Sequence, residues 1–279
     1  MIKDVTKFIN EIKRLGKEDD FENFFRGHSN SSYELTPTIY REGLIDSEDK
    51  IFREIILRIP QEFQGLNTTI EKLVKMQHYG VPTRLLDLTS NPLVALFFAC
   101  SSNKEIDGEV LYLRISKNEI KFYDSDTVSV LSNIAKRPIP FNIENYSGIT
   151  ISDFNMLTNI SFLHHDIKEE KPYFKEIINP NDVERVFAVK VKLDNPRILK
   201  QNGSFLIFGI DANKQRQATV PRDWIMNSKI PHLNLKIPAA KKQKILNELE
   251  ILGINESTLF PELDYQAKYL INKFKKVNS

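Results

Sequence analysis

The sequence predicts an α+β fold in a single domain, with helices at both ends of the chain. Strand and helix signals are both strong, but they do not alternate regularly, which disfavours a doubly wound parallel sheet. No internal repeat, low-complexity segment or Pro/Gly-rich linker divides the 279 residues. That length suits one large domain or two small ones, and it is ample for a sizeable core. We therefore expect a single domain over residues 1–279.

Helices are predicted where apolar residues recur at helical spacing between capping and stop signals. Thr68 and Glu71 fit a capping box. Asn91 can cap the helix that follows it, with Pro92 at its first position, where a missing N–H costs nothing. The predicted helices are 4–15, 47–63, 68–80, a segment starting at Pro92, 126–136, 151–177, 239–252 and 261–275.

Strands are predicted where β-branched and aromatic residues cluster or alternate between turn signals. The predicted strands are 21–27, 84–88, 108–115, 119–124, 183–193, 204–210 and 229–237. Residues 28–43 form a polar, turn-rich stretch whose length is typical of a binding loop rather than a connector. Residues 137–150 are irregular.

Composition and charge restrict the cellular setting more than the chemistry. The formal net charge of +2 argues neither for nor against a polyanionic partner. Cys100 is the single cysteine, so no intrachain disulfide forms, and a reducing compartment fits. No apolar run approaches the length of a membrane span, and charges interrupt the first residues too often for a signal peptide. We expect a cytoplasmic protein without a membrane partner.

Several common kinds of site have no support in the sequence. The five histidines do not pair with each other or with carboxylates at metal-ligand spacing. No P-loop, dinucleotide-binding glycine motif or nucleophile elbow is present. We therefore expect no metal ion.

The motif FFRG ends the strand at 21–27. Arg26 presents a planar fork of donors that suits bidentate capture of a carboxylate or phosphate, and Gly27 allows a close approach. Alternatively, Arg26 pairs with an internal acid and fixes the loop after the strand. The residues alone leave both interpretations open.

The stretch RLLDLTSN raises a related question, because a strand that looks buried carries two charges. Arg84 and Asp87 lie on opposite faces of a regular strand, so each needs another partner. Thr89, Ser90 and Asn91 follow at a junction between strand and helix, where free N–H groups and the helix dipole favour an anion. They equally suit a purely capping role.

Three stretches together resemble the FRG domain, a family named after its Phe-Arg-Gly motif. They are FFRG (24–27), MQHYGVPTRLLDLTSNPLVALFFA (76–99) and NPRILKQNGSFLIFG (195–209). The closing segment KIPAAKKQKILNELEILGINESTLFPELD resembles the usual end of that domain, so the resemblance covers about residues 20–272. The FRG domain is in turn similar to the ADP-ribosyltransferase superfamily. This implies a split, mainly antiparallel sheet with a ligand cleft between strands.

The similarity to ADP-ribosyltransferases implies NAD as substrate and three motif positions. An Arg or His on a first strand contacts NAD, and here Arg26 matches it. A Ser or Thr on a second strand supports the nicotinamide ribose, and Thr89 with Ser90 matches it. A later Glu acts on the ribose, and Gln201 lies nearest that position. An amide cannot stabilise a developing cation by charge or act as a base.

The departure at Gln201 leaves two interpretations. Either another carboxylate serves, with Asp87 the best candidate and Glu184 or Asp194 weaker, or the chain is a binding module on a transferase-like scaffold. The implied catalytic residues are Arg26, Asp87, Thr89 and Gln201. The implied nucleotide-binding residues are Arg26, Gly27, His28, Tyr79, Arg84, Thr89, Ser90, Asn91, Arg197 and Gln201.

The resemblance implies an ADP-ribosyltransferase-like protein that binds NAD and transfers ADP-ribose to a protein, a nucleic acid or water. Bacterial members of such groups are often toxins or phage-defence effectors. The alternative is a catalytically inactive module that binds a nucleotide or nucleic acid on the same scaffold. A nuclease-like protein is the weakest hypothesis, because no metal constellation is visible.

Overall fold

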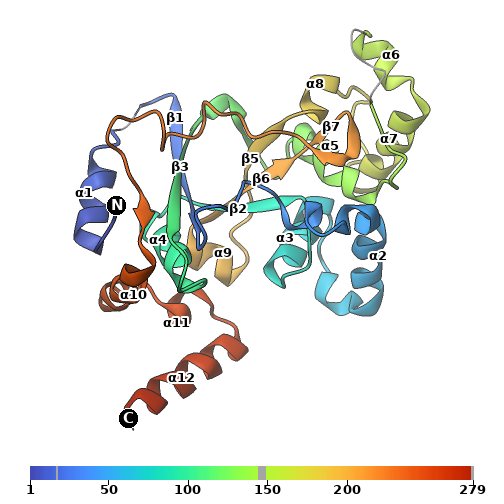
Figure 1. Ribbon diagram of the computed structural model, residues 1–279. Helices are drawn as coiled ribbons and strands as arrows, with labels where there is room; N and C mark the ends of the chain where they lie inside the picture. The colour runs from blue at the N-terminus through green and yellow to red at the C-terminus, as the bar shows by residue number, and fades with distance from the viewer. Residues whose placement is uncertain (17, 144–148, 278–279) are drawn as a thin grey trace.

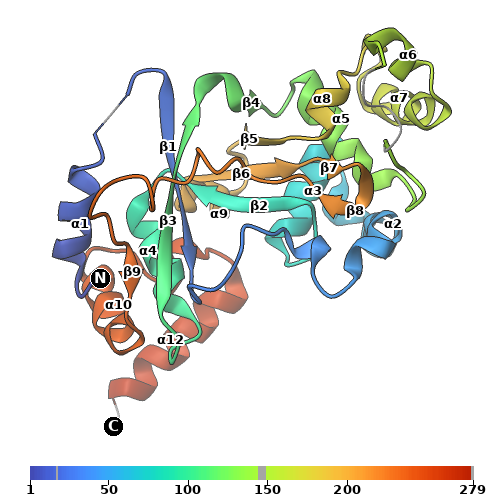
Figure 2. The same ribbon diagram turned by 45° about the horizontal axis from the view of Figure 1, so that its top comes forward.

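Seven strands form one mainly antiparallel sheet in the order β4-β5-β6-β2-β1-β3-β9 (Figures 1 and 2). The computed structural model describes residues 1–16, 18–143 and 149–277. β4 and β5 run parallel, and the other neighbours are antiparallel. The strands are β1 (Phe21–His28), β2 (Leu85–Thr89), β3 (Gly108–Ser116), β4 (Ile120–Phe122), β5 (Val186–Lys190), β6 (Gly203–Phe208) and β9 (Lys236–Ile237), beside a separate hairpin of β7 (Ile210–Asp211) and β8 (Asn213–Gln217).

Helices surround this sheet and confirm the predicted α+β class. In Figure 1, α4 lies along β1 and β3, α3 and α5 lie near β2 and β6, and α12 projects from the body beside the C-terminus. Among the described helices, none combines the length and apolar character needed to cross a bilayer. The helices are α1 (Val5–Lys13), α2 (Glu48–Arg58), α3 (Thr69–His78), α4 (Pro92–Ser101), α5 (Asp126–Asn133), α6 (Ile151–Asn155), α7 (Thr158–Glu170), α8 (Pro180–Val183), α9 (Pro196–Gln201), α10 (Lys242–Ile251), α11 (Glu256–Leu259) and α12 (Leu263–Val277).

Local capping signals were accurate guides to the helix starts. The Thr68 hydroxyl accepts from the Glu71 N–H, and the Glu71 carboxylate accepts from the Thr68 N–H, so the predicted capping box is present. The Asn91 side chain accepts from the Leu93 N–H and caps α4. The helix predicted over 47–63 ends earlier, at Arg58, because the residue before a proline is disfavoured in helical geometry and residue 60 is proline.

Several predicted strands and helices were too long. The strand predicted over 229–237 is wrong except for β9, since Pro231 cannot donate to a ladder and His232 has a left-handed φ of 66°. The strand predicted over 183–193 shrinks to β5. The helix predicted over 151–177 is two helices, α6 and α7, separated at the extended Leu157. Of the irregular stretch 137–150, residues 144–148 lie outside the described part of the chain.

One unpredicted helix bears directly on the cleft described below. No helix was predicted over residues 194–203, which were expected to be a loop, but α9 occupies most of them. Asn195 caps this helix by accepting from the Arg197 N–H, and Asn202 ends it in left-handed geometry. The sequence motif Asn-Pro at the start is the same signal that marks α4, so this helix was predictable from its cap.

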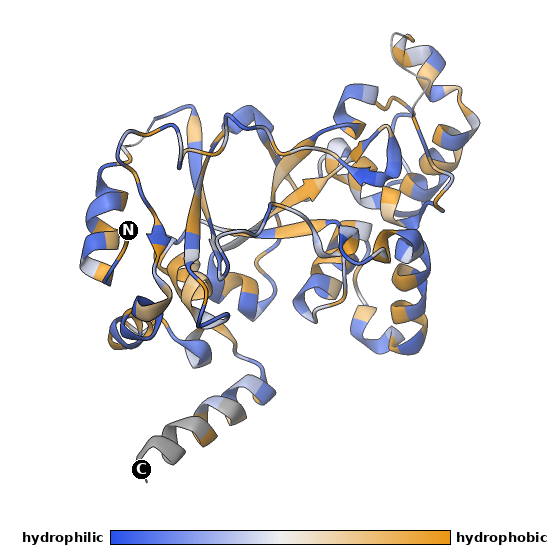
Figure 3. Ribbon diagram, viewed as in Figure 1, coloured by the Kyte–Doolittle hydropathy of each residue, from blue (hydrophilic) through white to orange (hydrophobic). Residues whose placement is uncertain are grey.

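The core lies on both faces of the sheet. Phe24, Leu88 and Leu206 point to one face, where the segment containing Trp224 covers them. Phe25 faces the other side and packs with α1, α4 and α10, while Leu85 packs there with α3, α5 and α7. Figure 3 shows the hydrophobic colours concentrated along the central strands and α4. Alternation along β1 therefore fixes which way each polar residue between these apolar ones must point.

The sheet opens at the junction between β1 and β2. β1 pairs with β3 along all of Phe21–His28, and β2 pairs with β6 along all of Leu85–Thr89. β1 and β2, in contrast, share the single register pair Phe25↔Thr89. We expected a split sheet, but all seven strands belong to one hydrogen-bonded sheet, which opens only where β1 and β2 diverge. This opening lies beside Arg26 and Asp87.

Candidate functional site

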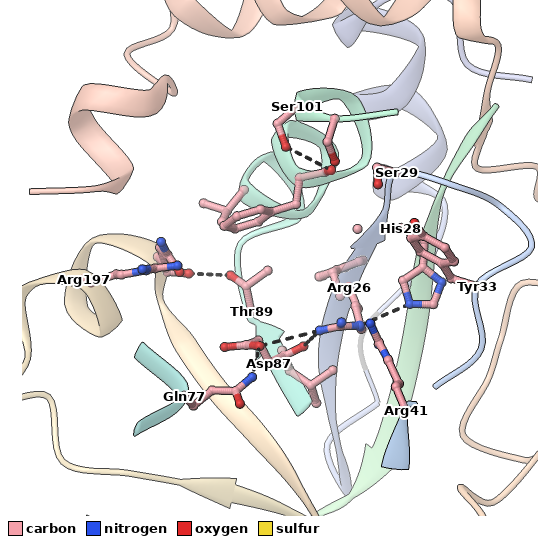
Figure 4. Close-up of a pocket in the computed structure, with 17 residues that line it drawn as sticks. Arg26, His28, Ser29, Tyr33, Arg41, Gln77, Asp87, Thr89, Ser101 and Arg197 are labelled. Carbon is pink, nitrogen blue, oxygen red and sulfur yellow. Dashed lines mark hydrogen bonds and ion pairs between the residues drawn. The ribbon is translucent and has the colours of Figure 1, made fainter. Parts of the chain in front are cut away.

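A cavity of about 280 Å³ lies where β1 and β2 diverge, and we call it the β1–β2 cleft (Figure 4). All four candidate catalytic residues line it, namely Arg26, Asp87, Thr89 and Gln201. The complete lining is Phe25, Arg26, Gly27, His28, Ser29, Tyr33, Arg41, Gln77, Asp87, Leu88, Thr89, Val94, Phe98, Ser101, Ser102, Arg197 and Gln201. The sequence-based hypothesis of one shared cleft is therefore consistent with the fold.

Arg26 links the two diverging strands. Its Nη1 donates to the Asp87 carbonyl oxygen at 2.6 Å and lies 3.9 Å from the Asp87 carboxylate. The Asp87 carbonyl oxygen thus accepts from the guanidinium instead of from a backbone N–H of β1, as it would in a regular β1–β2 ladder. Burial lowers the pKa of Arg26 below its usual value, and the nearby Asp87 opposes this shift. Arg26 remains a cation with a side chain that is 18% exposed to the cleft.

His28 holds the other side of the Arg26 fork. Arg26 Nε donates to His28 Nε2 at 3.1 Å, so Nε2 is unprotonated and the ring proton lies on Nδ1. Burial, followed by the charge of Arg26, lowers the pKa of His28 to about 4. His28 is therefore neutral near pH 7 and orients Arg26, and its Nε2 lone pair is already engaged.

Asp87 is held at the cleft by a short polar chain. Gln77 Nε2 donates to Asp87 Oδ2 at 2.8 Å, and Thr83 Oγ1 donates to Gln77 Oε1 at 2.7 Å. The Thr83 hydroxyl oxygen in turn accepts from the Leu85 N–H. The Asp87 side chain is 57% exposed, so it is oriented without being covered. Its carboxylate is free to meet a ligand in the cleft.

Thr89 and Gln201 form the wall opposite Arg26. The Thr89 hydroxyl donates to the Gln201 carbonyl at 2.7 Å and accepts from the Asn91 N–H at 3.0 Å. The Gln201 side-chain amide donates to the Leu259 carbonyl at 3.0 Å. Both side chains therefore fasten β2, α4 and α9 together, which is a structural role alongside any contact with a ligand.

Arg197 is fixed by the C-terminal segment. Its Nη1 donates to the His78 carbonyl at 3.0 Å and lies 4.0 Å from Glu262, while its guanidinium lies 4.6 Å from the Phe260 ring centre. His78 Nε2 lies 2.7 Å from the Glu262 carboxylate. Figure 4 shows Arg197 across the cleft from Arg26. Residues near the end of the chain thus complete a wall that begins near residue 26.

The family comparison falls on the same part of the chain. Residues 22–108 match the family model of the FRG domain. No curated protein and no solved structure matches the chain. The matched segment contains Arg26, Asp87 and Thr89, whereas Arg197 and Gln201 come from beyond it.

The glycine of the FRG motif has a packing role. A Cβ at Gly27 would lie 2.0 Å from the Ala95 carbonyl oxygen and 2.6 Å from the Ala99 nitrogen. Both atoms belong to the backbone of α4, which therefore crosses β1 at a distance that only glycine permits. The close approach predicted for Gly27 is confirmed, but the partner is helix α4, which lies in the same matched segment.

Four predicted nucleotide-binding residues do not line the cleft. Arg84 is fully buried and pairs with Glu48, so the prediction that it binds a nucleotide is wrong. Tyr79 is 59% exposed with Lys75 beside its ring. Ser90 is exposed, and the side-chain oxygen of Asn91 accepts from the Leu93 N–H as the cap of α4. The strand-parity argument was sound, because Arg84 and Asp87 do find separate partners.

The sequence analysis missed several lining residues. Ser29, Tyr33 and Arg41 come from the loop that was expected to bind a partner, and Gln77 comes from the last turn of α3. The loop therefore contributes to the lining of the cleft, but its individual residues carried no motif. Gln77 lies one residue before His78 in the motif MQHYG, and only its contact with Asp87 distinguishes it from a surface residue.

The donor set of the cleft indicates its chemistry. Asp87 is the sole carboxylate among the described lining residues, and Glu184 and Asp194 lie elsewhere. No group of three or more His, Cys, Asp or Glu side chains suited to a metal ion occurs in 1–16, 18–143 or 149–277. Burial raises the pKa of Cys100 to about 12, so this cysteine is not a thiolate nucleophile. Three arginines and one carboxylate favour an anionic ligand.

Proposed function

We propose that the β1–β2 cleft binds NAD or a related nucleotide and that this chain cleaves the bond between nicotinamide and ribose. The observation that carries the proposal is the convergence of Arg26, Asp87 and Thr89 on one cavity at the strand junction. Arginine forks suit phosphate oxygens, and a carboxylate suits a developing ribosyl cation. The arrangement also agrees with the resemblance of FRG domains to ADP-ribosyltransferases.

In the proposed reaction the Asp87 carboxylate acts in two successive steps. The C–N bond to nicotinamide breaks, the electron pair leaves with nicotinamide, and the ribose C1 becomes cationic. The Asp87 carboxylate stabilises that charge. A hydroxyl of a protein, a nucleic acid or water then forms the new bond to C1, and its proton passes to Asp87. Gln77 keeps the Asp87 carboxylate aimed through its 2.8 Å hydrogen bond.

A second function is favoured by the hydrogen bonds of the opposite wall. The Thr89 hydroxyl and the Gln201 amide are both engaged within the protein, and Gln201 carries no charge. Such a wall suits a module that binds a nucleotide, or a nucleic acid end, without turnover. The two functions share the ligand-binding cleft and differ in whether Asp87 acts chemically.

Nicotinamide release and NAD binding, measured on the same samples, separate these functions. The wild-type protein is expected to release nicotinamide from NAD, and Asp87→Asn to reduce the rate at least 100-fold while changing NAD affinity less than threefold. Asp211→Asn removes an exposed carboxylate that pairs with Arg216 on the β7–β8 hairpin and serves as the matched control. Saturable NAD binding without release in the wild type supports the second function. Absence of both binding and release contradicts both.

A further inference from the structure

One end of the β1–β2 cleft is lined almost entirely by hydrogen-bond donors. Arg26 and Arg41 lie side by side there, with Ser29, His28 and Tyr33 around them (Figure 4). Arg41 comes from the loop after β1 and has no role in the family motifs described above. Arg26 joins this end of the cleft to the Asp87 region, because its Nη1 donates to the Asp87 carbonyl oxygen.

The two arginines at this end repel each other. The charge of Arg41 contributes to lowering the pKa of both Arg26 and His28, after the larger effect of burial. Arg26 lies 3.9 Å from Asp87, while no carboxylate within the described residues pairs with Arg41. Arg41 is exposed, so water screens part of this repulsion, and an anion in the cavity would relieve the rest. The arrangement therefore favours a ligand with more than one negative charge.

The loop holds Arg41 in place before any ligand arrives. Arg41 Nη2 donates to the Thr36 carbonyl at 2.8 Å, which fixes one corner of its fork. The neighbouring Ile39 is fully buried, and its N–H donates to the Thr83 carbonyl at 3.3 Å. Arg41 is thus anchored through its own fork and through the backbone beside it. Its remaining N–H groups have no acceptor among the described residues and are available to a ligand.

Two neutral hydroxyls add to this donor set. Asn103 Nδ2 donates to Ser29 Oγ at 2.9 Å and to Tyr33 OH at 3.0 Å. Because both oxygens already accept from Asn103, each hydroxyl hydrogen is left to donate. Both residues line the same cleft as Arg41. Phosphate oxygens accept from arginine and hydroxyl donors alike, so the surroundings of Arg41 match a phosphate group.

We infer that Arg26 and Arg41 form a diphosphate site, in which each arginine binds one of two adjacent phosphate groups. Two incompletely compensated cations match the two charges of a nucleoside diphosphate linkage better than a single phosphate. The inference that a nucleotide is attached to the diphosphate depends on the function proposed above. The inference that a diphosphate binds depends only on the positions of the two arginines. Arg41 then determines specificity for ligands that carry a second phosphate.

Calorimetric titration with inorganic pyrophosphate and inorganic phosphate tests this site. The wild type should bind pyrophosphate at least tenfold tighter than phosphate, and added salt should weaken binding. Arg41→Gln should weaken pyrophosphate binding about tenfold and change phosphate binding less than threefold. Arg41→Lys keeps the charge but loses the fork, so an intermediate affinity is expected. Arg58→Gln removes an exposed arginine from α2 and controls for net charge.

The outcomes distinguish this inference from the proposed function. Unchanged pyrophosphate affinity in folded Arg41→Gln overturns the inference, as does equal binding of phosphate and pyrophosphate or no binding of either. Arg41-dependent pyrophosphate binding without any NAD binding supports the inference and contradicts the proposed function. Wild-type NAD affinity in Arg41→Gln contradicts the inference and leaves the proposed function standing. A thermal melt of each variant verifies that it is folded.

Discussion

Two arginines on neighbouring strands show how differently the same side chain is used. Arg84, just before β2, is fully buried and lies with Glu48 and Lys214 in what we call the Glu48 cluster. Arg26, on β1, faces the β1–β2 cleft, and the carboxylate that pairs with it, that of Asp87, lies 3.9 Å away and is exposed. Arg84 Nε donates to Glu48 at 2.9 Å, and its Nη1 donates to the Phe208 carbonyl at 2.9 Å. The first arginine is saturated by the protein, and the second is not.

The difference teaches what a buried charge needs. Burial alone would raise the pKa of Glu48, but Arg84 and Lys214 together lower it, so the carboxylate stays ionised. Each charge in the Glu48 cluster depends on the others, which makes the cluster a structural unit. In the cleft, incomplete compensation leaves donors for a ligand. The following predictions test this contrast, beginning with the largest effect.

Removing the central carboxylate of the Glu48 cluster should give the largest loss of stability. Glu48→Gln leaves Arg84 and Lys214 buried without a counter-charge, and we expect a loss of about 3–5 kcal/mol in the free energy of unfolding. Denaturant unfolding monitored by circular dichroism measures it. Glu54→Gln breaks the exposed pair with Arg58 and should cost less than about 1 kcal/mol. Equal losses in the two variants would show that the Glu48 cluster is not a structural unit.

Arg26→Gln should have the opposite balance of effects. The variant loses hydrogen bonds to the Asp87 carbonyl and to His28, and we expect a loss of about 1–2 kcal/mol in the free energy of unfolding. Pyrophosphate binding should fall below detection in the same protein. If instead the variant unfolds as readily as Glu48→Gln, Arg26 belongs with Arg84 as a structural residue.

His28 gives the smallest effect, and it appears as a pH dependence. Its pKa is about 4 in the folded protein against 6.5 for the ordinary side chain, so the unfolded chain binds more protons between these values. Its contribution to stability is therefore present above pH 6.5 and is lost as the pH falls toward 4, by at most about 1.4 kcal/mol per pH unit. His28→Gln should reduce this slope in urea unfolding.

The exposed His232 provides the control for that measurement. His232→Gln removes an exposed imidazole and is measured over the same pH range for comparison. Burial also lowers the pKa values of His78 and His164, so the His28→Gln protein retains part of the slope. A His28→Gln slope that matches the wild type would mean that His28 is not held neutral against Arg26.

Local chemistry made much of the fold predictable. Thr68, Glu71 and Asn91 act within a few residues of themselves, so their caps could be deduced from spacing alone. Strand parity separated Arg84 from Asp87 for the same reason. The strand predicted over 229–237 was too long because the alternation of apolar residues was given more weight than the local signal of Pro231.

The cleft was predictable only in part, because its polar contacts are long-range. Arg26, Asp87 and Thr89 were deduced from motif positions, and they do share one cavity. The ion-pair partner of each charged residue could not be deduced, because partners such as Glu48 and Arg84 are 36 residues apart in the sequence. Arg41 had no signal beyond its place in a polar loop. The role inferred for Arg41 depends on the lack of a paired carboxylate among the described residues, which a sequence does not display.

The single register pair between β1 and β2 also affects when the cleft comes into being during protein synthesis. β2 is otherwise held by β6, and Leu85 pairs with Ile207, so most of the chain must leave the ribosome before β2 is fixed. Arg197 is then positioned by Glu262, near the end of the described residues. A nascent chain that already contains the whole matched segment 22–108 therefore has both strands of the motif but no assembled cleft. The cleft is therefore complete only after residues up to Glu262 have been synthesised, and a translation product that ends at residue 108 is expected to lack it.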